Sequence, residues 1–143
     1  KRNPFNEIEC SDHYVRAMAS YGTFISACGF EYHGPKGFIG FAPKWSKENF
    51  KAPFTSAIGW GTYVQKKLGN KQLHQLNLKY GELCLEEISF EKIGGSDIKS
   101  VSVMLGSKNI SVQLYKNGRK LLIRFRKRIT IQKHENLNVT FSS

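Results

Sequence analysis

The segment from residue 7 to residue 16 holds five ionisable side chains, Glu7, Glu9, Asp12, His13 and Arg16. In a helix, side chains four residues apart lie on neighbouring turns, so Asp12 can pair with Arg16. The same spacing relates Glu9 to His13. Carboxylates accept hydrogen bonds from hydroxyl groups and arginine donates them, so such a cluster can hold a sugar through charge-assisted bonds. The simpler interpretation is a surface helix start with acids near the positive end of its dipole, and spacing alone favours it.

Trp60 and Tyr63 form a second candidate site, in a segment where Gly59 and Gly61 suggest a bend or a bulge. Exposed aromatic rings on a strand offer a flat platform for a sugar. A tryptophan is more commonly packed in a core. The sequence therefore leaves two alternatives, aromatic sugar contacts through Trp60 and Tyr63 or core packing of Trp60.

No motif in the chain indicates a metal or a cofactor. His33, His74 and His134 lack the spacing of metal ligands, and no glycine-rich phosphate loop occurs. The cysteines are Cys10, Cys28 and Cys84. Their number is odd and no CxxC pair occurs, so neither a disulfide framework nor a zinc site is indicated. Glu86 and Glu87 are adjacent, and in a strand they would point to opposite faces rather than act as a catalytic pair.

The chain is strongly basic, with 22 Lys and Arg residues against 11 acidic ones and a net charge of +11. Eight of the basic residues lie between Lys116 and Lys133, a stretch without an acid. Such a stripe attracts phosphates without encoding a sequence preference. Because no exposed aromatic residues are interleaved with it for base stacking, we favour a solvated strand face over a nucleic-acid site.

The composition predicts a folded protein of one domain, or of one small domain with a helical attachment. The chain has 143 residues, of which 40% are hydrophobic and 13% aromatic, more than a disordered segment carries. No run of about 18 apolar residues occurs, so we expect no membrane span. Because the first residue is Lys1 rather than methionine, we expect further sequence upstream, and the cellular compartment stays open.

Residues 1–29 are predicted to form one helix. Apolar residues recur at steps of three or four, the period of one helix face. They are Cys10, Tyr14, Ala17, Met18, Tyr21, Phe24, Ile25 and Cys28. Gly29 marks the expected stop, and either Asn3 or Ser11 can cap the start. Small residues interleaved with this stripe favour close packing against other helices.

Residues 30–143 are predicted to be β-structure, with short strands up to residue 70 and more regular hairpins over 71–143. Alternating residues around Asn117-Gly118 predict a hairpin that joins residues 110–114 to 121–125. The apolar residues expected to be buried have odd numbers up to Leu85 and even numbers from Ile88. This change of phase predicts a β-bulge near Glu86-Glu87. The fold class is therefore α+β and mainly β, with one helix followed by an antiparallel β-sandwich or open barrel.

Three segments together carry a resemblance to a known family. They are NPFNEIECSDHYVRAMASYG (residues 3–22), GFEYHGPKGFIGFAP (residues 29–43) and ENFKAPFTSAIGWGTYVQ (residues 48–65). They resemble the closing motif, and the segment after it, of glycoside hydrolase family 116, which contains the non-lysosomal glucosylceramidases and bacterial β-glucosidases. The resemblance covers residues 2–65.

The resemblance implies a retaining glycosidase whose catalytic domain is an (α/α)6 barrel, with residues 1–29 as its terminal helix and residues 30–143 as an accessory β-domain. It implies that Glu7 and Arg16 bind glucose, while Asp12 and His13 order the site. Both catalytic carboxylates lie upstream of Lys1 in that family, so no residue of this chain is expected to be catalytic, and the isolated chain is expected to be inactive. The expected partner is a β-glucoside or glycolipid, bound with the upstream domain.

Two other functions remain open at this point. One is a non-catalytic β-sandwich module that binds carbohydrate or packs on a partner domain. The other, less favoured, is a basic nucleic-acid-binding β-module that uses the stripe around Arg124, Arg126 and Arg128. Polyanion binding with a steep salt dependence would support the latter, and stabilisation of the isolated chain by a sugar would support the former.

Overall fold

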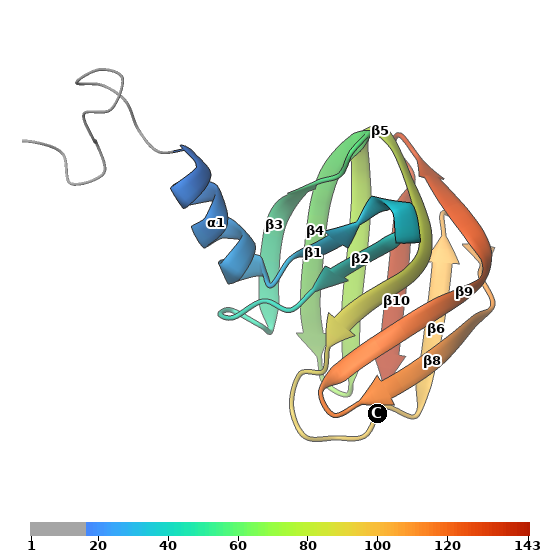
Figure 1. The fold of residues 1–143 in the computed structure, drawn as a ribbon. Helices are drawn as coiled ribbons and strands as arrows, with labels where there is room; N and C mark the ends of the chain where they lie inside the picture. Colours follow the sequence, from blue (N-terminus) through green and yellow to red (C-terminus); the bar gives the residue numbers. More distant parts are fainter. Residues whose placement is uncertain (1–16) are drawn as a thin grey trace, which may run out of the picture.

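The computed structural model describes residues 17–143, which form one α-helix followed by β-strands (Figure 1). The helix is α1 (Ala17–Cys28), and a 3-10 turn, η1 (Gly34–Lys36), separates the first two strands. The strands are β1 (Glu31–His33), β2 (Phe38–Phe41), β3 (Asn49–Thr55), β4 (Gly59–Leu68), β5 (Lys71–Glu91), β6 (Ser100–Leu105), β7 (Lys108–Asn109), β8 (Val112–Asn117), β9 (Lys120–Gln132) and β10 (Asn136–Ser142). The predicted mainly-β fold with one helix is confirmed.

Helix α1 ends where the sequence predicts. Gly29 has a φ of 53°, the left-handed conformation that commonly stops a helix. The last turn is fixed to the loop after β2, because the backbone N–H of Lys44 donates to the Ala27 carbonyl at 3.0 Å. Ala27 and Cys28 are buried, so the end of the helix closes one side of the core. Its predicted start at Asn3 or Ser11 lies outside the described residues.

The 21-residue strand β5 belongs to both layers of the fold. Its first half, residues 71–81, pairs with β4 and its second half, residues 82–91, pairs with β9. One layer is β3-β4-β5-β10-β6-β7 and the other is β1-β2-β5-β9-β8. The two layers face each other as a sandwich in Figure 1. Among the described strand pairs all are antiparallel except β2 with β5, which is parallel.

Bulges and a glycine let β5 change layers. The register shifts between Leu85 and Glu87, which confirms the bulge predicted there from the change in phase of the buried residues. A second shift lies between Trp60 and Gly61 on β4, opposite residues 78–80 of β5, and agrees with the bend or bulge expected from the glycines. Gly81 lies between the two shifts with a φ of 70°.

The predicted hairpin in the C-terminal half is confirmed as β8–β9, with Asn117 opposite Lys120. The two-residue loop is Gly118–Arg119 rather than Asn117–Gly118. Only the first loop residue, Gly118, has positive φ, at 57°, as in a type II′ turn. The inward residues of β9 are buried and those of β8 pack against them at the edge.

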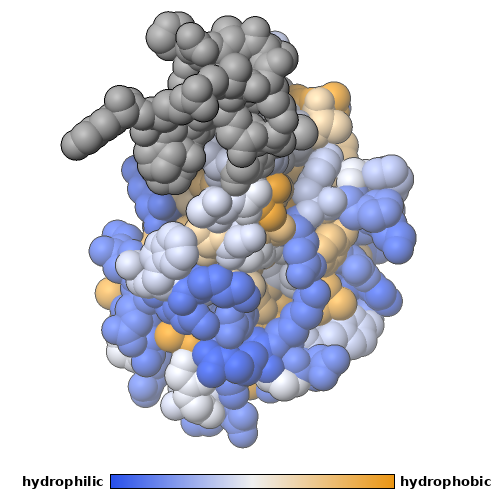
Figure 2. Space-filling model, turned by 60° about the vertical axis from the view of Figure 1, so that its left-hand side comes forward, coloured by the Kyte–Doolittle hydropathy of each residue, from blue (hydrophilic) through white to orange (hydrophobic). Residues whose placement is uncertain are grey.

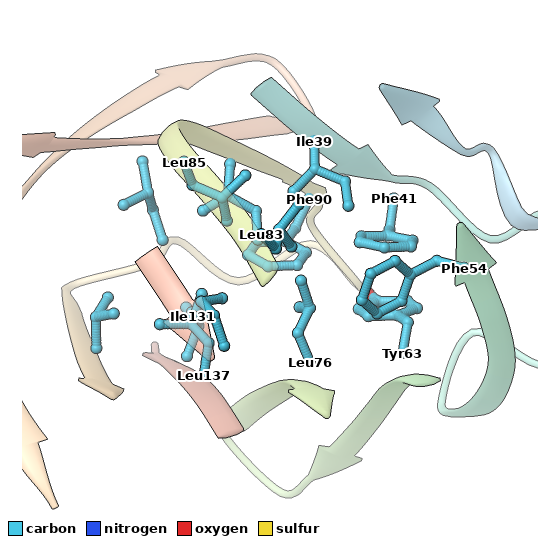
Figure 3. Packing of buried hydrophobic residues seen from close by; sticks show 14 of the residues in the cluster. Ile39, Phe41, Phe54, Tyr63, Leu76, Leu83, Leu85, Phe90, Ile131 and Leu137 are labelled. Atoms are coloured by element: carbon cyan, nitrogen blue, oxygen red, sulfur yellow. The ribbon is translucent and has the colours of Figure 1, made fainter. Parts of the chain in front are cut away.

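The core lies between the layers and receives apolar side chains from both (Figure 3). Phe41 of β2 stacks on Tyr63 of β4 with 3.9 Å between ring centroids and 9° between the planes. Leu83 and Leu85 of β5 meet Leu137 of the other layer in the same cluster. Each such buried side chain contributes about 1.5–3 kcal/mol by leaving water, so the contact between layers is the main source of stability.

Gly81→Ala is expected to destabilise the protein by about 2–4 kcal/mol. A β-carbon at Gly81 would lie 1.8 Å from the Ile58 carbonyl oxygen, in addition to the strain of a positive φ. Gly69→Ala is the matched control, because Gly69 also has positive φ, 55°, but its β-carbon would meet nothing within 4 Å. The control should lose only about 1 kcal/mol. Urea unfolding measures both changes, and equal losses would contradict the close approach at Gly81.

Candidate functional site

The residues with the strongest predicted roles precede the described part of the chain. Glu7, Asp12, His13 and Arg16 all lie outside the described residues. Helix α1 is described from Ala17, the residue directly after Arg16. The predicted roles of Glu7 and Arg16 in glucose binding, and of Asp12 and His13 in ordering the site, therefore stay predictions.

The predicted aromatic pair of Trp60 and Tyr63 is not formed. Trp60 is 51% exposed, whereas Tyr63 is completely buried and stacks on Phe41. In a strand, residues three apart point to opposite faces, so Trp60 on the outside places Tyr63 in the core. The prediction of Tyr63 as a sugar contact is wrong. Core packing of Trp60, the alternative, is also wrong.

Trp60 instead lies opposite Tyr80 of β5, which is 60% exposed. The sequence analysis missed Tyr80. Its position just before Gly81 resembles that of Trp60 between two glycines, but only the register of β4 on β5 shows that the two rings are neighbours. Trp60 therefore has an exposed aromatic neighbour, but this neighbour is Tyr80 and not the predicted Tyr63.

Four polar side chains are buried together in the core beside the aromatic cluster. The Tyr63 hydroxyl donates to Gln65 Oε1 at 2.8 Å and lies 2.7 Å from His74 Nδ1. On the other side of the imidazole, Gln72 Nε2 lies 2.8 Å from His74 Nε2. All four side chains are buried, and the His74 ring stacks on Phe90 with 3.9 Å between centroids.

Both ends of this chain of hydrogen bonds reach backbone carbonyl groups. Gln65 Nε2 donates to the Lys47 carbonyl and Gln72 Nε2 to the Glu91 carbonyl, each at 2.7 Å. The backbone N–H of Ile93 donates to Gln72 Oε1 at 2.9 Å. Outside the core, Lys47 Nζ lies 3.3 Å from the Glu91 carboxylate. We call this closed set the buried polar ring. Its members are Lys47, Gln65, Tyr63, His74, Gln72 and Glu91.

The hydrogen bonds fix the protonation of His74. Since Gln72 Oε1 accepts from a backbone N–H, Gln72 Nε2 must donate to His74 Nε2, and the ring proton is on Nδ1, donated to Tyr63. Burial lowers the pKa of His74 to about 3 and raises the pKa of Tyr63 well above its usual range. The imidazole is therefore neutral near pH 7. The imidazole is also closed off from solvent, so we assign the buried polar ring a structural role and not a catalytic one.

The adjacent carboxylates Glu86 and Glu87 do not form an acid/base pair. Glu87 lies 2.6 Å from Arg124, and Glu86 lies 2.7 Å from Arg128. The hydrogen bond that Arg124 donates to Glu87 raises the pKa of Arg124. These pairs tie the basic stripe to β5 at the bulge, but each arginine side chain stays about half exposed. Arg126, on the same strand, is exposed and has no partner within residues 17–143.

Within residues 17–143, no group of three or more His, Cys, Asp or Glu side chains is placed to hold a metal ion. No helix in the same range is long and apolar enough to cross a membrane. On the side of the molecule seen in Figure 2, hydrophilic residues predominate and hydrophobic ones show as separate patches between them.

A groove of about 560 Å³ lies on the outer surface of β3, β4, β5 and β10. Apart from the buried residues His74 and Val139, its lining residues alternate with those that point into the core, so they belong to the opposite face of the same strands. One row across the groove consists of Lys51, Val64, Gln75 and Asn138, each opposite the next on a neighbouring strand. The adjacent row consists of Asn49, Lys66, Leu73 and Thr140. We call this surface the outer groove.

The polar side chains of the outer groove are uncommitted. Those of Asn49, Gln75, Asn77 and Asn138 make no hydrogen bond to any described residue, and neither do the hydroxyls of Thr62 and Thr140. Three lysines line the groove, Lys51, Lys66 and Lys79, and none has an ion-pair partner in the described part of the chain. None of the described residues that line it is acidic. The groove therefore offers free donors, free acceptors and uncompensated positive charge.

Comparison with known proteins identifies no family for this chain. No protein-family model matches it, and no curated protein matches it. Among solved structures, an α-L-rhamnosidase from Dictyoglumus thermophilum is similar, with 14% sequence identity and a TM-score of 0.49. The similarity covers 96% of this chain and 15% of the rhamnosidase, so the chain spans a small part of that enzyme's length. It establishes neither a family nor an activity for the present chain.

The free energy of unfolding is expected to fall as the pH is lowered from about 6.5 towards 3. His74 binds a proton in the unfolded chain below pH 6.5 but in the folded one only near pH 3, so the slope should approach 1.4 kcal/mol per pH unit. Comparison with His74→Gln isolates this contribution from that of the carboxylates. The difference in the free energy of unfolding between the wild-type protein and His74→Gln should shrink as the pH is lowered.

Nuclear magnetic resonance of the wild-type protein gives an independent measurement of the same property. The His74 imidazole resonances should not titrate between pH 7 and 4. A His74 titration near pH 6.5 would contradict the buried neutral imidazole.

Replacement of Arg124, Arg126 and Arg128 by Gln together should leave a folded protein with a nearly unchanged melting temperature. The three side chains are exposed, and ion pairs between exposed charges contribute little to stability. Thermal unfolding followed by circular dichroism measures the effect. A loss of cooperative unfolding would contradict the interpretation of the stripe as a solvated face.

Proposed function

We propose that this chain is the C-terminal part of a retaining β-glucosidase-like glycoside hydrolase that resembles family 116. The observation that carries the proposal is the motif NPFNEIECSDHYVRAMASYG at residues 3–22, together with the two following segments up to residue 65. In this proposal the chain contributes groups that bind glucose, and the upstream domain contributes the catalytic carboxylates.

The described structure is compatible with this role in one specific respect. Helix α1 (Ala17–Cys28) includes the last residues of the motif and ends at the β-domain, with Ala27 and Cys28 buried in the core. Earlier in the same helix, Tyr21 is 45% exposed and its hydroxyl hydrogen-bonds to Thr55 at 3.0 Å. The helix therefore has one end anchored in the β-domain and a more exposed part that belongs to the motif, where further helices of a barrel can pack.

The proposed chemistry follows from the charges of the motif. Glu7 accepts hydrogen bonds from glucose hydroxyls and Arg16 donates to them, and both interactions are charge-assisted. Asp12 and His13 order these two side chains. In a retaining enzyme, one carboxylate attacks the anomeric carbon and a second acts first as acid and then as base. This chain supplies neither of those two groups in the proposal.

Glu7→Gln and Arg16→Ala, made in the complete enzyme, should each lower kcat/KM for an aryl β-glucoside by about 30- to 1000-fold. This corresponds to a loss of about 2–4 kcal/mol of transition-state stabilisation, as expected for a charged hydrogen bond in a partly dry site. Glu48→Gln and Arg126→Ala are matched controls, because both residues are exposed in the β-domain. Steady-state kinetics on the four variants provides the measurement.

Two results would contradict the proposal. Wild-type kinetics in both Glu7→Gln and Arg16→Ala would remove the assignment of the sugar-binding residues. Hydrolysis of the glucoside by the isolated 143-residue chain would show that its own carboxylates are sufficient, and would move the search for a catalytic pair to Glu7, Glu9 and Asp12.

A further inference from the structure

We propose that the outer groove, on the surface of β3, β4, β5 and β10, binds an acidic oligosaccharide. This inference goes beyond the proposed hydrolase function and does not depend on it. It rests on the shape of the groove, on the chemistry of its uncommitted side chains and on the sign of its charge.

The groove presents amide and hydroxyl groups in a regular grid. Neighbouring strands lie about 4.8 Å apart, and side chains on one face of a strand recur about every 6.7 Å. Gln75 and Asn138 are directly opposite each other on β5 and β10, and Asn77 is the next outward residue along β5. Each amide has both donors and acceptors, so adjacent strands can satisfy several hydroxyls of one sugar ring.

The apolar part of the groove is small and aliphatic. Val64 and Leu73 lie on adjacent strands near its centre and are partly buried. A sugar ring has C–H groups that can cover such a patch, while its hydroxyls reach the surrounding amides. Among the described residues, no Phe, Tyr or Trp lines the groove, and the ring of His74, which contributes to its wall, is buried and stacks on Phe90 in the core. Single-stranded nucleic acids are held mainly by base stacking on aromatic rings, so the lining favours a sugar chain over a nucleic acid.

The charge of the groove selects an acidic sugar chain over a neutral one. Lys51, Lys66 and Lys79 come from three different strands, so their ammonium groups are distributed across the groove rather than gathered at one end. The ion pair between Lys67 and Glu48 lies outside the groove, since neither residue lines it. Carboxylates on a bound oligosaccharide would supply the missing counter-charge.

The experiment is calorimetric titration of the 143-residue chain with an oligogalacturonate of four units, at low and at physiological salt. Cellotetraose is the neutral comparison and an oligothymidylate the polyanion comparison. Oligogalacturonate should bind more tightly than either, and its affinity should fall as salt is raised because charge pairing contributes.

Two groove variants and one control separate the contributions. Gln75→Ala with Asn138→Ala should weaken oligogalacturonate binding about tenfold or more, because it removes two amide partners. Lys51→Gln with Lys66→Gln should weaken binding to a similar extent and flatten the salt dependence. Arg126→Gln with Lys127→Gln removes the same charge from exposed positions on β9 and should change the affinity less than twofold.

Each alternative outcome overturns the proposal. Absence of oligogalacturonate binding at millimolar concentration removes the site. Equal binding of oligothymidylate, with no effect of the amide variant, shows polyanion attraction only. Equal binding of cellotetraose, with no effect of the lysine variant, shows a neutral sugar site. If Gln75→Ala with Asn138→Ala does not unfold cooperatively, Lys51→Gln with Lys66→Gln is the test. An unchanged affinity for oligogalacturonate and an unchanged salt dependence in that variant would then overturn the proposal.

The result is separable from the test of the hydrolase function. Binding to the outer groove is measured without turnover, and the groove variants should leave kcat/KM for an aryl β-glucoside unchanged in the complete enzyme. If oligogalacturonate does not bind but Glu7→Gln loses activity, the groove inference is overturned and the proposed hydrolase function is not.

Discussion

The buried polar ring is the constraint on which the rest of this fold depends. It places an imidazole, a phenol and two amides between the layers of a core in which Ser89 is the other buried polar residue among those described. Unpaired, each of those groups would cost about 1–3 kcal/mol, so the ring is compatible with folding only when every hydrogen bond is made. That requires the loop at Lys47, strands β4 and β5, and the end of β5 at Glu91 to be correctly placed at the same time. The ring therefore penalises alternative arrangements more strongly than an apolar core would.

The ring also explains how one strand can serve two layers. Gln72 and His74 lie in the first half of β5, and Glu91 is its last residue, so a hydrogen bond from Gln72 to the Glu91 carbonyl joins the two ends of the same strand. The strand must bend back on itself to make that bond. Gly81 and the register shift after Leu85 supply the bend, and the parallel contact with β2 closes the layer on the far side.

The features that the sequence predicted correctly are the local ones. The stop at Gly29, the β8–β9 hairpin and the bulge near Glu86 are encoded by neighbouring residues, through a glycine, a turn and a change of phase. Tyr63 was misplaced because it was paired with Trp60, although residues three apart in a strand point to opposite faces, so an exposed Trp60 leaves Tyr63 buried. The role of His74 was missed because its partners, Tyr63 and Gln72, become meaningful only once β4, β5 and the loop at Glu91 are assembled. The outer groove was missed for the same reason, since β10 lies beside β5 only through long-range pairing.

The buried polar ring and the outer groove are two sides of the same strands. On β5, Gln72, His74 and Leu76 point inward, and Leu73, Gln75 and Asn77 point outward. A slip of one residue would exchange the two sets, placing free amides in the core and the imidazole outside. The fully bonded ring makes that slip costly, because His74 and Gln72 would lose every partner at once. The arrangement of free amides and lysines on the surface is therefore held by hydrogen bonds on the opposite side of the sheet, and the rigidity of the groove derives from the core beneath it.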